Sequence, residues 1–315
     1  MTLDPLALVP ILLAVALDLA YGDPPNRFHP VAWIGSGLIE ARRRLPKRGR
    51  LLPFFCGALL MGTGLLAVIT LGDGIVRGLE RTPRPVALAA EAILLKSLFS
   101  IRGLAVAAKS VALALSREDL PGARALASWH LVGRPTDHLD ASLVAAAAIE
   151  SVAENANDSV VAPLLYYGLG GLSGILAYRL INTADSVLGH RDPEREWLGK
   201  VPARLDDLAN LIPARLTALM IILAAPCAGG HSSQAVGIWW RDSRRTASPN
   251  AGHPMSAAAG ALNVELEKVG AYRLGEGLRA PEVADIDRSV RLLSATIGLA
   301  LIPIGAIRLV LAAQR

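Results

Sequence analysis

The sequence contains few cysteines, the residues that crosslink small domains through disulfides or bound metal ions. It has 2 cysteines in 315 residues, and aromatic side chains make up only 4% of it. Cys56 and Cys227 stand in separate apolar segments, so we expect two small buried hydrophobic residues, not a disulfide or a CxxC metal site. The chain also lacks internal repeats and low-complexity linkers. What it has in abundance is hydrophobic residues, 52% of the total, with a mean hydropathy of +0.42. This composition is typical of a polytopic membrane protein.

Apolar segments recur along the whole chain. The first covers residues 5–21 and has neither a basic stretch before it nor a small-residue cleavage site, so we expect a retained helix and not a signal peptide. The others are residues 51–71, 86–99, 160–181, 216–228 and 292–311. The sequence therefore predicts an all-α polytopic integral membrane protein, a single domain over residues 1–315. It should have about 4–6 membrane-embedded helical segments, a re-entrant or hairpin core and cytoplasmic polar loops.

The net charge of +5 is better explained by basic loops beside a membrane than by a nucleic-acid surface. Residues 42–50 are the most basic stretch and are expected on the cytoplasmic side. The apolar run 216–228 is shorter than the ~20 residues that span a bilayer. If it enters the membrane and returns on the same side, every polar motif stays on the cytoplasmic side. We therefore expect a multi-pass protein of the cytoplasmic membrane, with its active site facing the cytoplasm and no nucleic-acid partner.

Residues 150–186 combine polar ends with an apolar middle. Glu150, Glu154 and Asp158 are spaced to share one face of a helix. Carboxylates this close repel one another unless a cation lies between them, and Mg²⁺ prefers oxygen ligands beside substrate phosphates. Two amphipathic helices with solvated faces are the alternative. The functional interpretation is favoured because the charges border an apolar segment, where ionisable groups are costly.

Two further polar groups follow the glycines at 170, 171 and 174, which predict a turn. One is a helical stripe that contains Asn182 and Asp185. The other lies in residues 204–215, where Asp206, Asp207 and Asn210 form a second oxygen-rich set suited to Mg-phosphate. Arg204 and Arg215 in the same stretch could pair with phosphate oxygens.

Six segments, in this order, carry a family resemblance: GDPPNRFHPVAWIG, KSLFSIRGL, ESVAENANDSVVAPLLYY, YRLINTADSVLGH, ARLDDLANLIPARLTA and SPNAGHPMSAAAGAL. The chain resembles the adenosylcobinamide-phosphate synthase family of cobalamin biosynthesis (CobD/CbiB) over essentially its whole length. The resemblance implies an integral membrane enzyme. Its reaction would be the ATP-dependent joining of adenosylcobyric acid to (R)-1-aminopropan-2-ol phosphate, or to aminopropanol, through an amide bond. An acyl phosphate would be the intermediate, and the product adenosylcobinamide phosphate or adenosylcobinamide.

The resemblance also implies roles for residues, with ATP and Mg²⁺ as cofactors. The expected metal ligands are Glu154, Asp158, Asp185, Asp206 and Asp207. The expected catalytic residues are Glu150, Glu154, Asp158, Asp185 and His253, of which Glu150 or His253 would take the amine proton. The expected substrate and phosphate contacts are Lys96, Arg102, Arg179, Asn155, Asn182, Asn210, Arg215 and Asn250. Asp23 and His29 belong to the matching motifs without separable roles.

Three other classes of protein are alternatives. A non-catalytic membrane sensor of the AmpE type would show degraded acid and Asn motifs. A membrane phosphotransferase or prenyltransferase would carry DxxxD-type pairs on two helices, and a transporter would show inverted repeats. The expected partners are the corrinoid, aminopropanol phosphate and the lipid bilayer; a partner protein or a homo-oligomer stays open.

Overall fold

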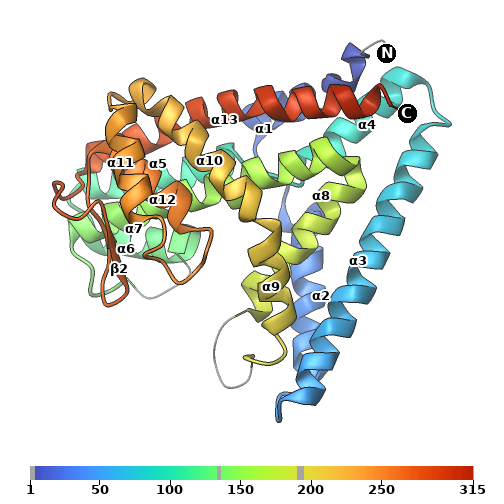
Figure 1. The fold of residues 1–315 in the computed structure, drawn as a ribbon, viewed down its shortest axis with the longest axis horizontal. Coiled ribbons are helices and arrows are strands. Elements are labelled where there is room, and N and C mark those ends of the chain that lie inside the picture. The colour runs from blue at the N-terminus through green and yellow to red at the C-terminus, as the bar shows by residue number, and fades with distance from the viewer. Residues whose placement is uncertain (1–3, 133–135, 190–194, 315) are drawn as a thin grey trace. The chain divides into compact units, whose positions relative to one another are not determined.

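The protein is built almost entirely of helices (Figure 1). A computed structural model describes residues 4–132, 136–189 and 195–314. The longer helices are α1 (Val9–Tyr21), α2 (Pro30–Arg44), α3 (Leu51–Leu79), α4 (Arg84–Lys96), α5 (Arg102–Ser116), α6 (Leu120–Ala127), α7 (Ala141–Asn155), α8 (Ala162–Leu188), α9 (Lys200–Ala209), α10 (Leu211–Ala224), α11 (Ser232–Asp242), α12 (Gly252–Leu262) and α13 (Val283–Ala312). Two short strands, β1 (Leu266–Lys268) and β2 (Tyr272–Leu274), pair antiparallel.

Four stretches of the described chain are long and apolar enough to cross a membrane: Leu51–Leu79, Ala141–Leu188, Leu211–Ala228 and Val283–Ala312. Pro5–Tyr21 is a shorter apolar helix. This confirms the predicted class, an all-α polytopic membrane protein. The stretch Leu211–Ala228 consists of α10 and a 3₁₀ turn that ends at Ala228. It is longer than the apolar run 216–228 because α10 begins five residues before that run, at Leu211. At 18 residues it lies at the lower limit for a crossing, so the predicted return to the same side of the membrane stays a prediction.

The chain divides into two compact units, each assembled from separate segments. Unit 1 contains residues 1–100, 162–210 and 304–315, and unit 2 contains residues 101–161 and 211–303. The expectation of a single domain over 1–315 therefore stays a prediction.

In unit 1, α1 packs against α4, while α2, α3 and α9 pack around α8. Their shared core contains Leu38, Met61, Leu180 and Leu198. The outer side of α3 leaves large apolar residues exposed, among them Leu52, Phe55, Leu59 and Leu66. An apolar helix face left uncovered by protein is what a lipid-facing span requires.

The α8 helix contains the break that the glycines predict. Gly171 has φ +62° and ψ −148°, which no α-helical residue adopts. Beyond it the chain turns back on itself, since the rings of Tyr166 and Tyr178 stack with centroids 5.1 Å apart. In a straight helix, residues twelve positions apart would lie about 18 Å apart. The predicted turn in the central segment is confirmed, and Gly171 is the residue that makes it.

In unit 2, α12 packs against α7, α10 and α11, and α5 packs against α6 and α7. The β1–β2 hairpin follows α12 and its first strand contacts α7. All of α12 is buried, from Gly252 to Leu262. It consists largely of small residues, which let neighbouring helix backbones approach closely.

The end of α7 corrects one expectation from the sequence. Residues Ala156–Val161 form a π-helical turn, not a continuation of the α-helix. Because a π turn adds a residue per turn, Asp158 is rotated away from the line through Glu150 and Glu154 that a regular helix would give. The uniform carboxylate stripe is therefore interrupted. Turns of this kind inside α-helices are frequent at functional sites.

Candidate functional site

The residues predicted for the site divide between the two units. In unit 1 are Lys96, Arg179, Asn182, Asp185, Asp206, Asp207 and Asn210, with Asp23 and His29. In unit 2 are Arg102, Glu150, Glu154, Asn155, Asp158, Arg215, Asn250 and His253. The structure groups each set into smaller clusters, which are described in turn.

The first cluster joins the end of α8 to α9, and we call it the carboxylate cluster: Asn182, Asp185, Asp206, Asp207 and Asn210. Asn182 Nδ2 lies 3.3 Å from Asp206 Oδ1, a distance at which it donates a weak hydrogen bond. Tyr178 donates from its hydroxyl to Asn210 Oδ1 at 3.0 Å, which fixes the end of α9 to the second arm of α8. Tyr166 donates to the Ala209 carbonyl at 3.0 Å and ties the first arm to the same place.

Like charges crowd this cluster. Burial, followed by the neighbouring Asp185 carboxylate, raises the pKa of Asp206 to about 6, and the hydrogen bonds from Asn182 and Asn210 oppose the rise. Arg204 Nη1 lies 3.2 Å from Asp207 Oδ2 and offsets one of the charges. Among the residues with described positions, no three His, Cys, Asp or Glu side chains are grouped as a metal site. Asp185, Asp206 and their amide neighbours nevertheless supply hard oxygen donors of the kind that Mg²⁺ takes with substrate phosphates and water.

The second cluster of unit 1 lies around Lys96, which is buried. Lys96 Nζ is 3.0 Å from Asp23 Oδ1 and 3.5 Å from Asp18 Oδ1, and Ser100 donates to the other oxygen of Asp23 at 2.5 Å. His29 Nε2 stands 4.0 Å from Asp23. Burial lowers the pKa of His29, while Asp23 opposes that shift. The Lys96 ammonium is thus compensated by two carboxylates, and a phosphate would have to compete with them.

Arg179 and Arg102 were both expected to hold phosphates. Arg179 is buried and donates from Nε to the Leu98 carbonyl, which orders the chain after α4. Arg102 is the first residue of α5 and is exposed. Their proposed contacts with phosphate stay predictions.

In unit 2, the end of α7 and the π turn hold a network of side chains. Asn157 Nδ2 donates to Asp158 Oδ1 at 2.7 Å, and Thr217 of α10 donates to Asn157 Oδ1 at 3.1 Å. Ser159 donates to Asn155 Oδ1 at 2.9 Å. Glu150 is buried one helical turn before Glu154, which is partly exposed. The network shows that the π turn is held against α10 by polar contacts within this unit.

A basic pocket of about 390 Å³ lies beside α11 and α12 in unit 2. Its lining residues, which we call the Arg–Trp pocket, are Arg215, Trp239, Trp240, Arg241, Ser243, Arg244 and His253. Arg215 Nη1 donates to the Leu211 carbonyl at 2.7 Å and lies 3.4 Å from Asn250 Oδ1. The structure thus brings together three of the predicted residues: Arg215, Asn250 and His253.

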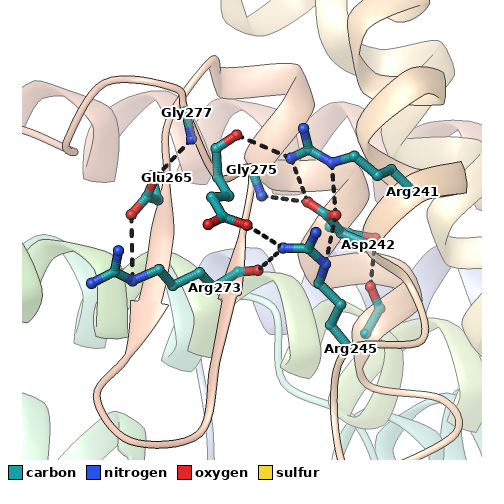
Figure 2. A network of polar contacts seen from close by, with 10 residues as sticks. Arg241, Asp242, Arg245, Glu265, Arg273, Gly275 and Gly277 are labelled. Carbon is teal, nitrogen blue, oxygen red and sulfur yellow. Dashed lines mark hydrogen bonds and ion pairs between the residues drawn. The ribbon is translucent and has the colours of Figure 1, made fainter.

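Sequence analysis missed the network that supports one side of this pocket. Asp242, fully buried at the end of α11, accepts two hydrogen bonds from Arg241 at 2.8 Å and one from the Gly275 backbone N–H at 2.7 Å. Arg245 lies 3.0 Å from the same carboxylate and 2.8 Å from Glu276 (Figure 2). The pKa of Asp242 is lowered by these donors, against the effect of burial. The WWRDSRR stretch was the available signal, since an acid within a basic run suggests internal pairing.

The architecture is that of a helical, multi-pass membrane protein with three polar clusters and a basic pocket. A family model described as CobD/Cbib protein matches residues 11–293. A "Cobalamin biosynthesis protein CobD" from Dehalococcoides mccartyi is 41% identical over 268 residues, 85% of this chain and 86% of the relative. A protein of the same name from Geobacter metallireducens is 43% identical, with 87% and 86% covered, and a "Probable cobalamin biosynthesis protein CobD" from Methanothermobacter thermautotrophicus is 41% identical, with 84% and 86% covered.

The chain therefore belongs to the CobD/CbiB family, as its motifs predict. No solved structure matches it.

Proposed function

We propose that this protein is the adenosylcobinamide-phosphate synthase of cobalamin biosynthesis. It would join adenosylcobyric acid to (R)-1-aminopropan-2-ol phosphate, or to aminopropanol, with ATP as the source of free energy. The observation that carries this proposal is the family match over residues 11–293, together with relatives about 40% identical that are named for cobalamin biosynthesis. The substrate, the ATP dependence and the intermediate are our inferences.

The proposed chemistry follows from the reactants. A carboxylate does not react with an amine unaided, because its leaving group would be oxide. Transfer of the γ-phosphoryl group of ATP to a carboxylate oxygen gives an acyl phosphate and ADP. Attack of the neutral amine then forms the amide bond and releases phosphate, which carries away that carboxylate oxygen. The amine arrives as an ammonium ion, so a base has to take its proton before attack.

The carboxylate cluster fits the needs of a nucleotide with bound Mg²⁺. Mg²⁺, when bound, would neutralise charge on the transferring phosphoryl group. Asp185 and Asp206 are the residues we propose to hold it, with Asp207 beside them. The pKa of Asp206 is raised first by burial and then by the Asp185 carboxylate, and a bound cation would relieve both effects. Asn182 helps to orient the Asp206 side chain by hydrogen bonding.

Unit 2 by itself contains further candidate groups, in the π turn and in the Arg–Trp pocket. Glu154 and Asp158 remain candidates for a metal or for the amine proton, and Glu150 for the base. Arg215 and Asn250 are already joined and would meet a phosphate together. We place the active site on the cytoplasmic side of the cytoplasmic membrane, because ATP and the basic loop over residues 42–50 would both be found there.

The test uses the purified protein in detergent with adenosylcobyric acid, Mg-ATP and either amine. Corrinoid mass and nucleotide hydrolysis are followed in parallel. We expect the corrinoid to gain the mass of the amine minus water, with one ADP formed for each product. ATP hydrolysis without a corrinoid product would point to a partner protein that delivers a substrate. Neither product nor hydrolysis would contradict the proposal and favour a non-catalytic role of the AmpE type.

A further inference from the structure

The Arg–Trp pocket combines positive charge with flat aromatic surface. Arg215 of α10 and Arg244 after α11 both line it, and among the residues described neither has a carboxylate partner. Arg215 is bound only by the neutral oxygens of Leu211 and Asn250. Arg241 differs, because both arms of its guanidinium are paired with Asp242. Two arginine charges of the pocket therefore lack an anion within the described chain.

His253 adds a hydrogen-bond donor on the same wall. Trp239 Nε1 donates to His253 Nδ1 at 2.9 Å, so in the neutral ring the proton is carried on Nε2. Burial, then Arg215 and Arg244, lower the pKa of His253 to about 4. The ring is thus neutral at pH 7 and offers an N–H, not a lone pair, at its second nitrogen. Burial is the largest cause of this shift, and the part due to Arg215 and Arg244 reflects the positive charge of the pocket.

The indoles complete the site. Trp240, near the end of α11, lines the pocket and is 83% exposed, although tryptophan side chains are on average largely buried. An indole face next to arginines suits the stacking of a nucleobase while guanidinium groups bind phosphate oxygens in pairs. The volume of about 390 Å³ lies within the range of small-molecule pockets.

We propose that the Arg–Trp pocket binds the phosphate of a soluble substrate between Arg215 and Arg244, beside the exposed indole of Trp240. The proposal rests on the function proposed above and deepens it. It assigns His253 as a donor to the phosphate, in place of the base role expected from the sequence. It also adds Arg244, Trp239 and Trp240 to the residues expected at the site.

The test has to distinguish a soluble ligand from a lipid, because a lipid headgroup can also supply a phosphate. One lining residue, Arg215, belongs to the candidate membrane span Leu211–Ala228, and Trp and Arg side chains also gather where lipid headgroups lie. A lipid headgroup and a nucleotide both carry a phosphate group. Only the nucleotide or the amine phosphate would bind to the pocket from solution.

The experiment measures binding to the intact protein in detergent by calorimetry and tryptophan fluorescence. The ligands are a non-hydrolysable ATP analogue and (R)-1-aminopropan-2-ol phosphate, each with and without Mg²⁺. Arg244→Gln is the main variant because its side chain is exposed and its loss should not affect folding. Its control is Arg117→Gln, an exposed arginine that does not line the pocket. Trp240→Phe, with Trp129→Phe as its control, tests the stacking.

We expect Arg244→Gln to raise the Kd of one of these ligands by about tenfold, while Arg117→Gln changes it by less than about twofold. The ligand affected identifies the phosphate source. Ligand-induced quenching should be reduced in Trp240→Phe and retained in Trp129→Phe if that ligand is the nucleotide. Unchanged affinities in Arg244→Gln would overturn the proposal. So would an effect of this variant only on binding to nanodiscs that contain anionic lipid.

Failure of the pocket proposal can be distinguished from failure of the proposed synthase function. Product formed by the wild type, with an unaltered KM for ATP and for the amine phosphate in Arg244→Gln, would refute the pocket and leave the synthase intact. If binding depends on Arg244 but the protein forms no product, the pocket is supported and the synthase function is contradicted.

Discussion

At the scale of single residues, the carboxylate cluster has the clearest chemical signature. Asp206 is flanked by Asp185 and by two amides, and burial together with the neighbouring charge raises its pKa to about 6. A protein that kept this arrangement for stability alone would do better with one carboxylate fewer, since the charges repel. We therefore interpret the cluster as a site for a divalent cation and not as part of the packing.

Asp206→Asn keeps the shape of the side chain and removes its charge. We expect kcat/KM to fall by at least about a hundredfold, because a ligand of the proposed Mg²⁺ would be lost. The concentration of Mg²⁺ required for half-maximal rate should rise as well. Steady-state kinetics over a Mg²⁺ titration measure both. Glu80→Gln, at the exposed end of α3, is the control. Wild-type kinetics in Asp206→Asn would remove the carboxylate cluster from the reaction.

His253 gives a prediction for pH. Its pKa in the folded protein, about 4, lies below the ordinary value of 6.5. The folded state therefore favours the neutral ring, so the contribution to stability is complete above pH 6.5 and is lost as the pH falls toward 4. At most about 3 kcal/mol is involved. Thermal unfolding in detergent should show wild type and His253→Gln drawing closer in Tm between pH 7 and pH 4.5. A constant difference in Tm would refute this assignment.

At the scale of elements, the turn at Gly171 determines how the two arms of α8 meet. Its φ of +62° is one that side chains rarely adopt, although a Cβ there would meet only Arg308 Nη1 at 3.6 Å. A side chain at this position would therefore destabilise the fold through backbone strain and not through a steric clash.

Gly171→Ala should therefore destabilise the protein by about 1–3 kcal/mol. Gly170→Ala is the matched control, because a Cβ at that position meets nothing and its φ is not positive. Gly170→Ala should leave stability unchanged or slightly higher. Thermal unfolding of the two variants in the same detergent tests the comparison. Equal Tm values would mean that the turn tolerates an alanine.

The β1–β2 hairpin is held to α11 through Asp242. Asp242→Asn would weaken the contacts with Arg241 and Arg245 and the charged acceptor of the Gly275 N–H, and we expect a loss of roughly 1–3 kcal/mol. Faster tryptic cleavage at Lys268 and Arg273 would report the loosened hairpin. Glu276→Gln, which removes only an exposed pair with Arg245, should be cleaved near the wild-type rate. Equal cleavage of the two variants would contradict the anchoring role of Asp242.

Much of this element-level picture follows from the sequence. The apolar segments and the turn at the glycines are local signals, because each depends on residues that are neighbours in the chain. The π turn over Ala156–Val161 could not be predicted, since a single added residue in a helix leaves no mark on the spacing of apolar side chains.

The contacts of Lys96 could not be predicted either. Asp18 and Asp23 lie more than seventy positions away in the chain, and only the packing of α1 on α4 brings Asp18 near Lys96. The carboxylate cluster is an intermediate case. Asn182 and Asp206 were both predicted as site residues, but their hydrogen bond depends on how α9 returns to α8.

At the scale of the whole molecule, the account joins a family assignment to two chemical sites. Family membership is shown by matches over most of the chain. The polar residues of unit 1 provide the proposed metal site, and those of unit 2 provide the basic pocket. The reaction proposed for them requires a phosphoryl transfer followed by attack of an amine, and both steps can be followed by one isotopic label.

The most direct measurement supplies adenosylcobyric acid with ¹⁸O in its free carboxylate, together with ATP, Mg²⁺ and aminopropanol phosphate. Mass spectrometry then follows the corrinoid, the nucleotide and the released phosphate. The account predicts an amide product that has lost one ¹⁸O, with that ¹⁸O in inorganic phosphate and ADP as the other product. Label in AMP would contradict the acyl phosphate. An unchanged corrinoid with unlabelled phosphate would contradict the ligase itself.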